Sequence, residues 1–195
     1  MKAYLESSKY IDWHHPEIVQ QAQDLAVQCS SNEEIAESCF VFVRDHIQHS
    51  KDYERNPVTV KASEVLQHRT GYCYAKSHLL AALLRANHIP AGLCYQRLTV
   101  EPDGSLFCLH GLNGVFLEQY GWYRVDARGN KPGVDAQFCP PREQLAFSLD
   151  SVGECNIQGV WPQPLPVVIE VLEQSETYLE VFHNLPDVAI GEWGE

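Results

Sequence analysis

The chain has 195 residues, of which 45% are hydrophobic and 21% are charged, and its formal net charge at pH 7 is −12. This length allows one domain with a sizeable core, and the composition is ordinary for a globular protein. The negative charge opposes nonspecific attraction to nucleic acid and to anionic lipid, and no run of Lys and Arg forms a local basic patch. We therefore expect neither nucleic acid nor a membrane as a partner.

No apolar run approaches the roughly 18 residues that span a bilayer. Residues 1–17 lack the apolar stretch and the small-residue cleavage site of a secretory signal, so a cytoplasmic location is the expectation. The seven cysteines are odd in number and include no CxxC pair. We expect them to be reduced thiols, most of them packed in the core.

The first quarter of the chain predicts two helices. Apolar residues at helical spacing predict a helix over about 17–29. Ser31 followed by Glu34 is typical of a capping box, so a second helix starts there and runs to about Gln48. The polar segment that follows, HSKDYERNPVTV, is predicted to be irregular because its proline disfavours a helix.

A third long helix begins near a cysteine. Ser63 can cap a short helix, EVLQHR, which is predicted to end near Gly71. The almost unbroken apolar pattern after it predicts a helix over about 72–87, which Pro90 halts. Cys73 therefore lies in the first turn of a helix whose other residues are mostly apolar and are predicted to be buried.

Beyond this helix the pattern predicts strands. Residues 91–100 predict one strand, and EPDGS (101–105) predicts a turn because its glycine tolerates positive φ. Residues 106–119 and 122–129 predict two more strands, joined near residues 120 and 121.

Helices first and an antiparallel meander second predict the α+β class, with the N-terminal helices packed on an antiparallel sheet. We interpret residues 1–195 as a single domain whose core spans about 31–129. Proline and glycine become frequent after residue 130. Residues 130–195 are therefore expected to be an extension that wraps the core, with a short helix or strand or two.

Three side chains in these elements suggest nucleophilic catalysis: Cys73 at a helix start, His110 in the middle strand and Asp126 in the next strand. A thiol attacks only as the thiolate, and the positive end of a helix favours that anion. An imidazolium at His110 would favour it further and could later protonate a leaving amine. Asp126 would fix the imidazole tautomer, and the backbone N–H of Cys73 is a natural oxyanion donor.

The predicted sheet brings the histidine and the aspartate together only in part. Residues 110 and 126 have the right parity to share a face of adjacent antiparallel strands. A turn centred near 120, however, pairs 126 with about 114, four residues from the histidine. The pattern therefore calls for a bulge at Gly111 or Gly114, or for a wider loop.

At these residues the chain resembles the transglutaminase-like superfamily, within the wider papain-like cysteine enzyme fold. The phrases that carry the resemblance are GYCYAKSHLLAALLRANHIPAG, LHGLNGVFLEQ and GWYRVDARG, which cover about residues 62–129 in the family's order and spacing. The segment FVRDHIQHSKDY upstream is also similar. One departure concerns Leu112, which stands where the family often has a tryptophan, so the cleft wall and the substrate do not carry over.

The resemblance implies a Cys-His-Asp triad of Cys73, His110 and Asp126, and acyl chemistry on an amide through a thioester. It implies a thiol-dependent hydrolase or acyltransferase that acts on a peptide or peptide-like amide without a cofactor. Members of the family include protein cross-linking enzymes, peptidases, peptide-N-glycanases and inactive proteins. A protein-glutamine transglutaminase and a non-catalytic binding module on the same fold therefore stay open as alternatives.

Four further residues are weaker candidates for the cleft. Gln67 lies six residues before Cys73, the separation at which papain-like proteases carry an oxyanion-hole glutamine, although a solvated helix face is the favoured interpretation. Tyr72, Tyr74 and Trp122 are expected to line the cleft, with ordinary core packing as the alternative. The histidines and cysteines have no second pair at zinc-ligand spacing, and no acidic loop is dense enough for calcium, so no metal site is predicted.

Overall fold

The computed structural model describes residues 1–100 and 104–188. Its elements, in chain order, are η1 (Lys2–Tyr4), α1 (Pro16–Ala26), α2 (Asn32–His46), β1 (Gln48–His49), α3 (Ala62–His68), β2 (Thr70–Gly71), α4 (Cys73–Ala86), β3 (Ala91–Thr99), β4 (Phe107–Leu117), β5 (Gly121–Val125), β6 (Gln137–Cys139), β7 (Arg142–Gln144), β8 (Cys155–Trp161), α5 (Pro166–Gln174) and α6 (Tyr178–His183). The predicted α+β class, with helices packed on an antiparallel sheet, is confirmed.

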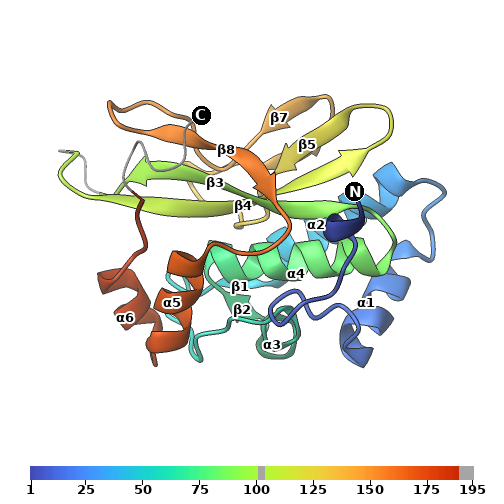
Figure 1. Ribbon diagram of the computed structural model, residues 1–195, viewed down its shortest axis with the longest axis horizontal. Helices are drawn as coiled ribbons and strands as arrows, with labels where there is room; N and C mark the ends of the chain where they lie inside the picture. Colours follow the sequence, from blue (N-terminus) through green and yellow to red (C-terminus); the bar gives the residue numbers. More distant parts are fainter. Residues whose placement is uncertain (101–103, 189–195) are drawn as a thin grey trace.

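The helix α4 is the centre of the molecule. It lies between the strands on one side and the short elements α3, β1 and β2 on the other, with α1 and α2 beside it (Figure 1). Leu79, Leu80, Leu83 and Leu84 are completely buried. Burial of a leucine side chain stabilises the fold by about 1.5–3 kcal/mol, so this helix is a main source of core stability.

The main sheet has four antiparallel strands in the order β5-β4-β3-β8. The meander β3–β4–β5 is the one that the sequence predicts. The strand β8 comes from the C-terminal part of the chain and pairs with the outer edge of β3. The described part of the predicted extension, residues 130–188, therefore completes the sheet and adds α5 and α6, which is more regular structure than the sequence predicted for an extension.

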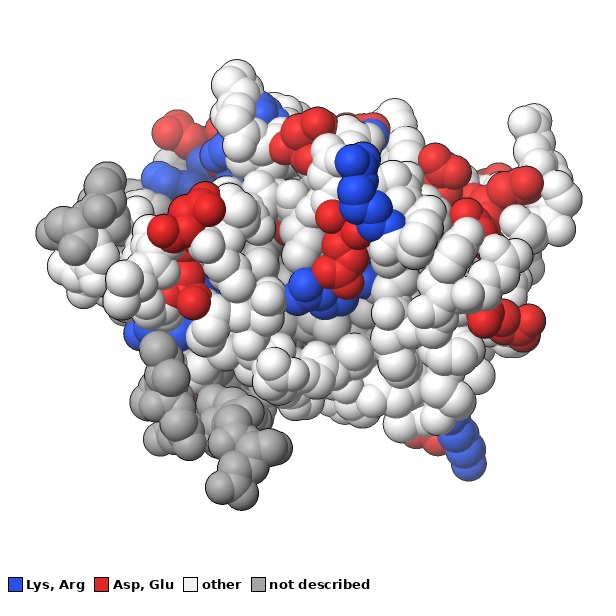
Figure 2. All heavy atoms as spheres, turned by 90° about the horizontal axis from the view of Figure 1, so that it is seen from above, with Lys and Arg blue, Asp and Glu red and all other residues white. Residues whose placement is uncertain are grey.

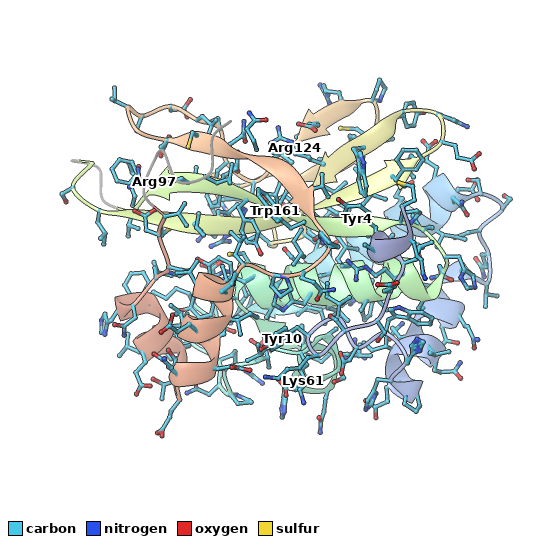
Figure 3. The ribbon with its side chains drawn as sticks, in the orientation of Figure 1. Tyr4, Tyr10, Lys61, Arg97, Arg124 and Trp161 are labelled. Carbon is cyan, nitrogen blue, oxygen red and sulfur yellow. The ribbon has the colours of Figure 1, made fainter. Side chains whose placement is uncertain are left out.

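The N-terminus is fastened to this added strand. Tyr4, labelled in Figure 3, lies over Gly92 of β3 together with Val160, since a Cβ at Gly92 would meet both side chains. The Tyr4 hydroxyl donates a hydrogen bond to the carbonyl oxygen of Val160 at 2.9 Å, and its ring meets Trp122 edge-on at a centroid distance of 4.7 Å. The N-terminal segment thus packs on β8 and on Trp122 of β5.

Helix starts follow the predicted caps in one case and not in another. The Ser31 side chain accepts a hydrogen bond from the backbone N–H of Glu34, as the capping box predicted. The prediction that Ser63 caps a helix is wrong, because α3 begins at Ala62, two residues earlier than predicted, and has Lys61 at its N-cap. The Ser63 hydroxyl and backbone N–H instead donate to the Asp12 carboxylate.

The hairpin between β4 and β5 has a regular register, from Asn113 opposite Val125 to Leu117 opposite Gly121. This ladder passes Gly114 without a bulge, so a bulge there, which the sequence suggested, is wrong. The hairpin is centred on residue 119 and not on 120. One further step along the same register places residue 126 opposite 112, which is only two residues from His110.

The predicted turn over 101–105 lies largely outside the described residues, since 101–103 are not described. Among the described helices, none combines the length and the apolar character that crossing a membrane requires.

Candidate active site

Cys73 is the first residue of α4 and is buried, with 6% of its surface exposed. Tyr72 is the N-cap, and its side chain makes no capping hydrogen bond to the helix; the first helical bond runs from the N–H of Lys76 to the Tyr72 carbonyl. The N–H groups of the first turn therefore have no partner within the helix. They present the positive end of the helix dipole to the sulfur, as the sequence predicted.

A short parallel strand pair fixes the backbone that leads into Cys73. The N–H of Gln48 donates to the Arg69 carbonyl at 2.9 Å, and the N–H of Ser50 donates to the Gly71 carbonyl at 3.1 Å. The Thr59 hydroxyl donates to the carbonyl between these two, that of Thr70, at 2.9 Å. These bonds hold the approach to the helix in one geometry, so the position of the sulfur is set before the helix begins.

The strand β4 reaches the helix start at a glycine. The N–H of Gly111 donates to the Cys73 sulfur at 3.4 Å. A Cβ at position 111 would lie 3.0–3.2 Å from the ring and the backbone of Tyr74, which is too close for an ordinary contact. The absence of a side chain thus allows β4 to approach α4, and this approach brings the neighbouring His110 to the thiol.

His110 and Asp126 form a buried pair. The His110 Nε2 and the Asp126 Oδ2 are 2.7 Å apart, and the two residues are 4% and 0% exposed. Asp126 follows the last residue of β5 and also accepts hydrogen bonds from the N–H groups of Arg128 and Ala146, at 3.1 and 3.0 Å. With Nε2 turned to the carboxylate, the other ring nitrogen is left for the sulfur.

The charges of the three groups support one another. Burial of the His110 ring opposes its protonation, but the Asp126 carboxylate, the Cys73 side chain and hydrogen bonds to both raise its pKa to about 10. Burial likewise opposes ionisation of Asp126, but the His110 charge and the hydrogen bonds hold the pKa of Asp126 below its ordinary value. Near neutral pH the pair is therefore an imidazolium and a carboxylate, and this cation can stabilise a thiolate.

The cysteine and the histidine open into a cleft of about 720 Å³. Tyr72 and Tyr74 line it, as the sequence predicted, and their hydroxyl groups donate to the carbonyls of Tyr178 and Leu109. Phe147 also lines it, and its ring meets the His110 imidazole edge-on at a centroid distance of 5.0 Å. The wall is thus partly aromatic, and α6 contributes to it through the bond from Tyr72.

The structure does not bring the other two candidates to this cleft. Trp122 is exposed and packs against Tyr4 and Phe116, at centroid distances of 4.7 and 5.7 Å. Gln67 is exposed and lies at a separate pocket formed with residues of α1. The prediction that Trp122 lines the cleft is wrong, and Gln67 lies on the solvated helix face that was the favoured interpretation. Leu112 is fully buried and is not among the described residues that line the cleft.

One cleft residue was missed by the sequence analysis. His49 is 7% exposed, and its ring meets the Tyr72 ring edge-on at a centroid distance of 5.4 Å. Within the described residues its Nδ1 has no hydrogen-bond partner. Burial and the nearby Arg128 cation lower its pKa well below the ordinary value, so the ring is neutral near pH 7. The pairing of His49 with Gly71 places the His49 side chain at the cleft. A parallel ladder of only two residues leaves no sequence pattern that predicts it.

No metal site is found in residues 1–100 and 104–188, where no group of three or more His, Cys, Asp or Glu side chains could hold an ion. The described cleft wall offers the thiols of Cys73 and Cys108, the imidazoles of His49 and His110, and charged side chains around them.

Comparisons with known proteins bear on the family and the fold of the chain. The model of the transglutaminase-like superfamily matches residues 19–127, which is more than half of the chain. Among solved structures, a candidate cysteine protease from Cytophaga hutchinsonii matches with a TM-score of 0.50 and 18% identity, over 64% of this chain and 40% of that one. The periplasmic domain of TgpA from Pseudomonas aeruginosa matches with a TM-score of 0.49 and 18% identity, over 64% of this chain and 45% of that one.

These comparisons reach as far as the fold. At 18% identity the likeness to the Cytophaga hutchinsonii structure supports the fold alone. The chain spans less than half the length of either solved structure. None of the curated proteins matches the chain.

Proposed function

The chain belongs to the transglutaminase-like superfamily, and from this premise we propose that it is a thiol-dependent hydrolase or acyltransferase acting on a peptide or peptide-like amide. The observation that carries the proposal is the meeting of Cys73, at the positive end of α4, with the buried pair of His110 and Asp126. A binding module would have no need for a thiol and an imidazolium stabilised in this way.

The reaction takes two steps. In the first, the Cys73 thiolate attacks the amide carbonyl, and the His110 imidazolium gives its proton to the leaving amine, which departs and leaves a thioester on the sulfur. In the second, water or an amine attacks the thioester carbonyl and gives its proton to His110. The acyl group leaves as an acid or as a new amide, and the thiolate–imidazolium pair is restored.

Two supports act on these steps without exchanging protons. Asp126 holds Nε2 of His110, so the opposite ring nitrogen stays directed at the sulfur in both protonation states. The free N–H of Cys73, at the first turn of α4, is placed to donate to the oxygen that becomes negative when the carbonyl is attacked. Removal of one such donor typically costs about 10²–10³ in kcat.

The experiment is a peptide-library screen in the presence of a labelled primary amine, read by mass spectrometry. We expect an acyl adduct on Cys73, together with either free acid or amine-labelled product. Free acid identifies a hydrolase and labelled amine identifies an acyltransferase, including the protein-glutamine transglutaminase alternative.

Two variants control this screen. Cys73→Ala is expected to abolish the adduct and the products. Cys108→Ala, which removes another thiol of the same cleft, is expected to keep both. Peptide binding without any adduct or product in the unaltered protein would favour the binding module and would refute the enzyme.

A further inference from the structure

The end of the cleft beside His49 carries an excess of positive charge. The described cleft wall includes three cations from two short segments, Lys51 after β1 and Arg128 and Lys131 after β5, but only one carboxylate from the same two segments, that of Asp52. His49, which also lines the cleft, is neutral near pH 7 because burial and Arg128 lower its pKa.

The Asp52 carboxylate is shared by two of these cations. The Arg128 guanidinium donates to it at 2.6 and 3.1 Å, and the Lys131 ammonium donates to it at 2.8 Å. Both hydrogen bonds hold the pKa of Asp52 below its ordinary value. One negative charge therefore faces two positive charges, and the more exposed Lys131, which lines the cleft, has N–H donors that this bond does not use.

Lys51 has no carboxylate partner among the described residues. Its ammonium lies 4.0 Å from the centroid of the Phe182 ring and 5.9 Å from that of Tyr178. Both rings belong to α6, so this helix holds the lysine in place through cation–π contacts that do not neutralise its charge. The surplus at this end of the cleft is thus two positive charges, on Lys51 and Lys131.

The other carboxylates of the described cleft wall are already engaged. Glu154 accepts hydrogen bonds from the hydroxyl and the N–H of Thr99 and from the N–H groups of Asp150 and Ser151. Asp150 accepts from the Ser148 hydroxyl. Both acids belong to the segment before β8, and in the described part of the chain neither forms an ion pair with Lys51 or Lys131.

The surplus is local, because the chain as a whole carries a net charge of −12. On the face over the strands, Figure 2 shows Lys and Arg side chains next to Asp and Glu side chains and no broad basic surface. A positive end inside a cleft of an acidic protein attracts anionic ligands to that cleft and not to the surface in general.

We propose that Lys51 and Lys131 bind a carboxylate of the substrate close to the amide that Cys73 attacks, which makes acidic peptides or peptide-like acids the substrate class. The proposal rests on the proposed function for its amide, but the carboxylate site itself does not. Arg128 is the positioning residue, since its charge is used to hold Asp52.

Two alkylating reagents of nearly equal size test the site directly. Iodoacetate carries a carboxylate and iodoacetamide is its neutral counterpart, and both mark Cys73. The His110 imidazolium also attracts the anion, so the informative quantity is the change in each second-order rate constant when a lysine is removed.

We expect Lys51→Gln and Lys131→Gln each to lower the iodoacetate rate constant about threefold, through the loss of one nearby charge, and to leave the iodoacetamide rate constant unchanged. Lys2→Gln, an equal charge change at the exposed N-terminus, is expected to change neither. Equal effects on both reagents, or no effect on either, would overturn the carboxylate site.

The same assay separates this inference from the proposed function. If Cys73 reacts with iodoacetamide no faster than a free thiol, the catalytic proposal fails, while the effect of the lysines on the iodoacetate rate still reports on the carboxylate site. If labelling is fast but insensitive to the lysines, the carboxylate site fails alone.

Competitors identify the source of the carboxylate. N-acetylglycine offers a terminal carboxylate and N-acetylaspartic α-amide offers a side-chain carboxylate, and each has a neutral diamide as its control. An acid that slows alkylation by iodoacetate more than its own diamide does identifies the kind of carboxylate that the site binds, terminal or side-chain. Slowing by neither acid would count against the site.

Discussion

At the scale of single residues, the site consists of buried charged groups, and the burial of each one without a partner would cost free energy. A buried imidazolium is disfavoured by desolvation, and so is a buried carboxylate. His110 and Asp126 are both almost completely buried, yet their 2.7 Å contact leaves each of them charged. The sulfur of Cys73 gains a cation that the protein maintains over a wide range of pH.

This argument fixes the direction of a titration. The pKa of His110 is raised to about 10, so the ring stays protonated across the neutral range and loses its proton as the pH rises through that value. The stability that the ion pair contributes is fully present below the pKa of an unfolded histidine, about 6.5, and is lost on the same rise. In Asp126→Asn the main group that raises the pKa is gone, so we expect His110 to titrate at lower pH.

Ring carbon and nitrogen shifts in NMR spectra measure this titration, with Asp24→Asn, an exposed carboxylate on α1, as the control. A His110 pKa near the value of a free imidazole in the unaltered protein would contradict the account, as would an equal pKa in Asp126→Asn.

Some of these residues could be predicted from the sequence and others could not. Cys73, His110 and Asp126 were found because a helix start and two strands are visible as patterns of apolar residues. Tyr72 and Tyr74 are the sequence neighbours of Cys73, so they lie at the same helix start. Whether a side chain on a predicted element points into a cleft depends on packing, which no local pattern specifies, and Trp122 was therefore misplaced.

At the scale of elements, the contact between β4 and α4 decides the geometry. The strand comes close enough for the N–H of Gly111 to reach the Cys73 sulfur, because no side chain stands between the strand and the backbone of Tyr74. A second glycine of the same strand, Gly114, faces the Val160 side chain and the Cys94 sulfur instead, with contacts of 3.0–3.3 Å to a new Cβ.

The two glycines give a matched pair of substitutions. In Gly111→Ala the new methyl group meets the helix backbone at Tyr74, which cannot rotate away. We therefore expect β4 to be displaced from α4, which increases the distance between His110 and the Cys73 sulfur. We expect the alkylation rate of Cys73 to fall about tenfold or more, since small displacements of reacting groups cost this much. In Gly114→Ala the side chain of Val160 can adjust, and the rate is expected to stay within about twofold.

Unfolding temperatures of both variants accompany the rate measurements, so that a loss of fold is separated from a displaced histidine. An equal loss of rate in the two variants, at equal stability, would show that the close approach at Gly111 has no special role.

The elements themselves differ in how far the sequence predicts them. The long helices and the meander have clear periodicity and caps, and their observed bounds differ from the predicted ones by a few residues. The ladder of β1 with β2 joins residues about 22 positions apart over two residues each, which is too short to leave a periodic pattern. The strand β8 is amphipathic only in part, and its partner β3 lies far away in the sequence.

At the scale of the whole molecule, the site depends on segments from the entire described chain. Arg85, at the far end of α4, is completely buried and donates to the carbonyls of Glu6, Ala91 and Pro162. One side chain thus joins the N-terminal segment, β3 and the end of β8 around the helix that carries the nucleophile. The net charge and composition predict a globular acidic protein, but they do not predict the positive end of the cleft, because it arises from two short segments that meet only in the fold.

The central claim is that Cys73 is held as an ion pair with His110, and the most direct measurement is the rate of Cys73 alkylation by iodoacetamide near pH 6. At this pH a free thiol is almost entirely protonated, so the account predicts labelling at least about tenfold faster than that of a free thiol, and a fall to the free-thiol rate in His110→Ala. Labelling at the free-thiol rate in the unaltered protein, or fast labelling that survives in His110→Ala, would contradict it.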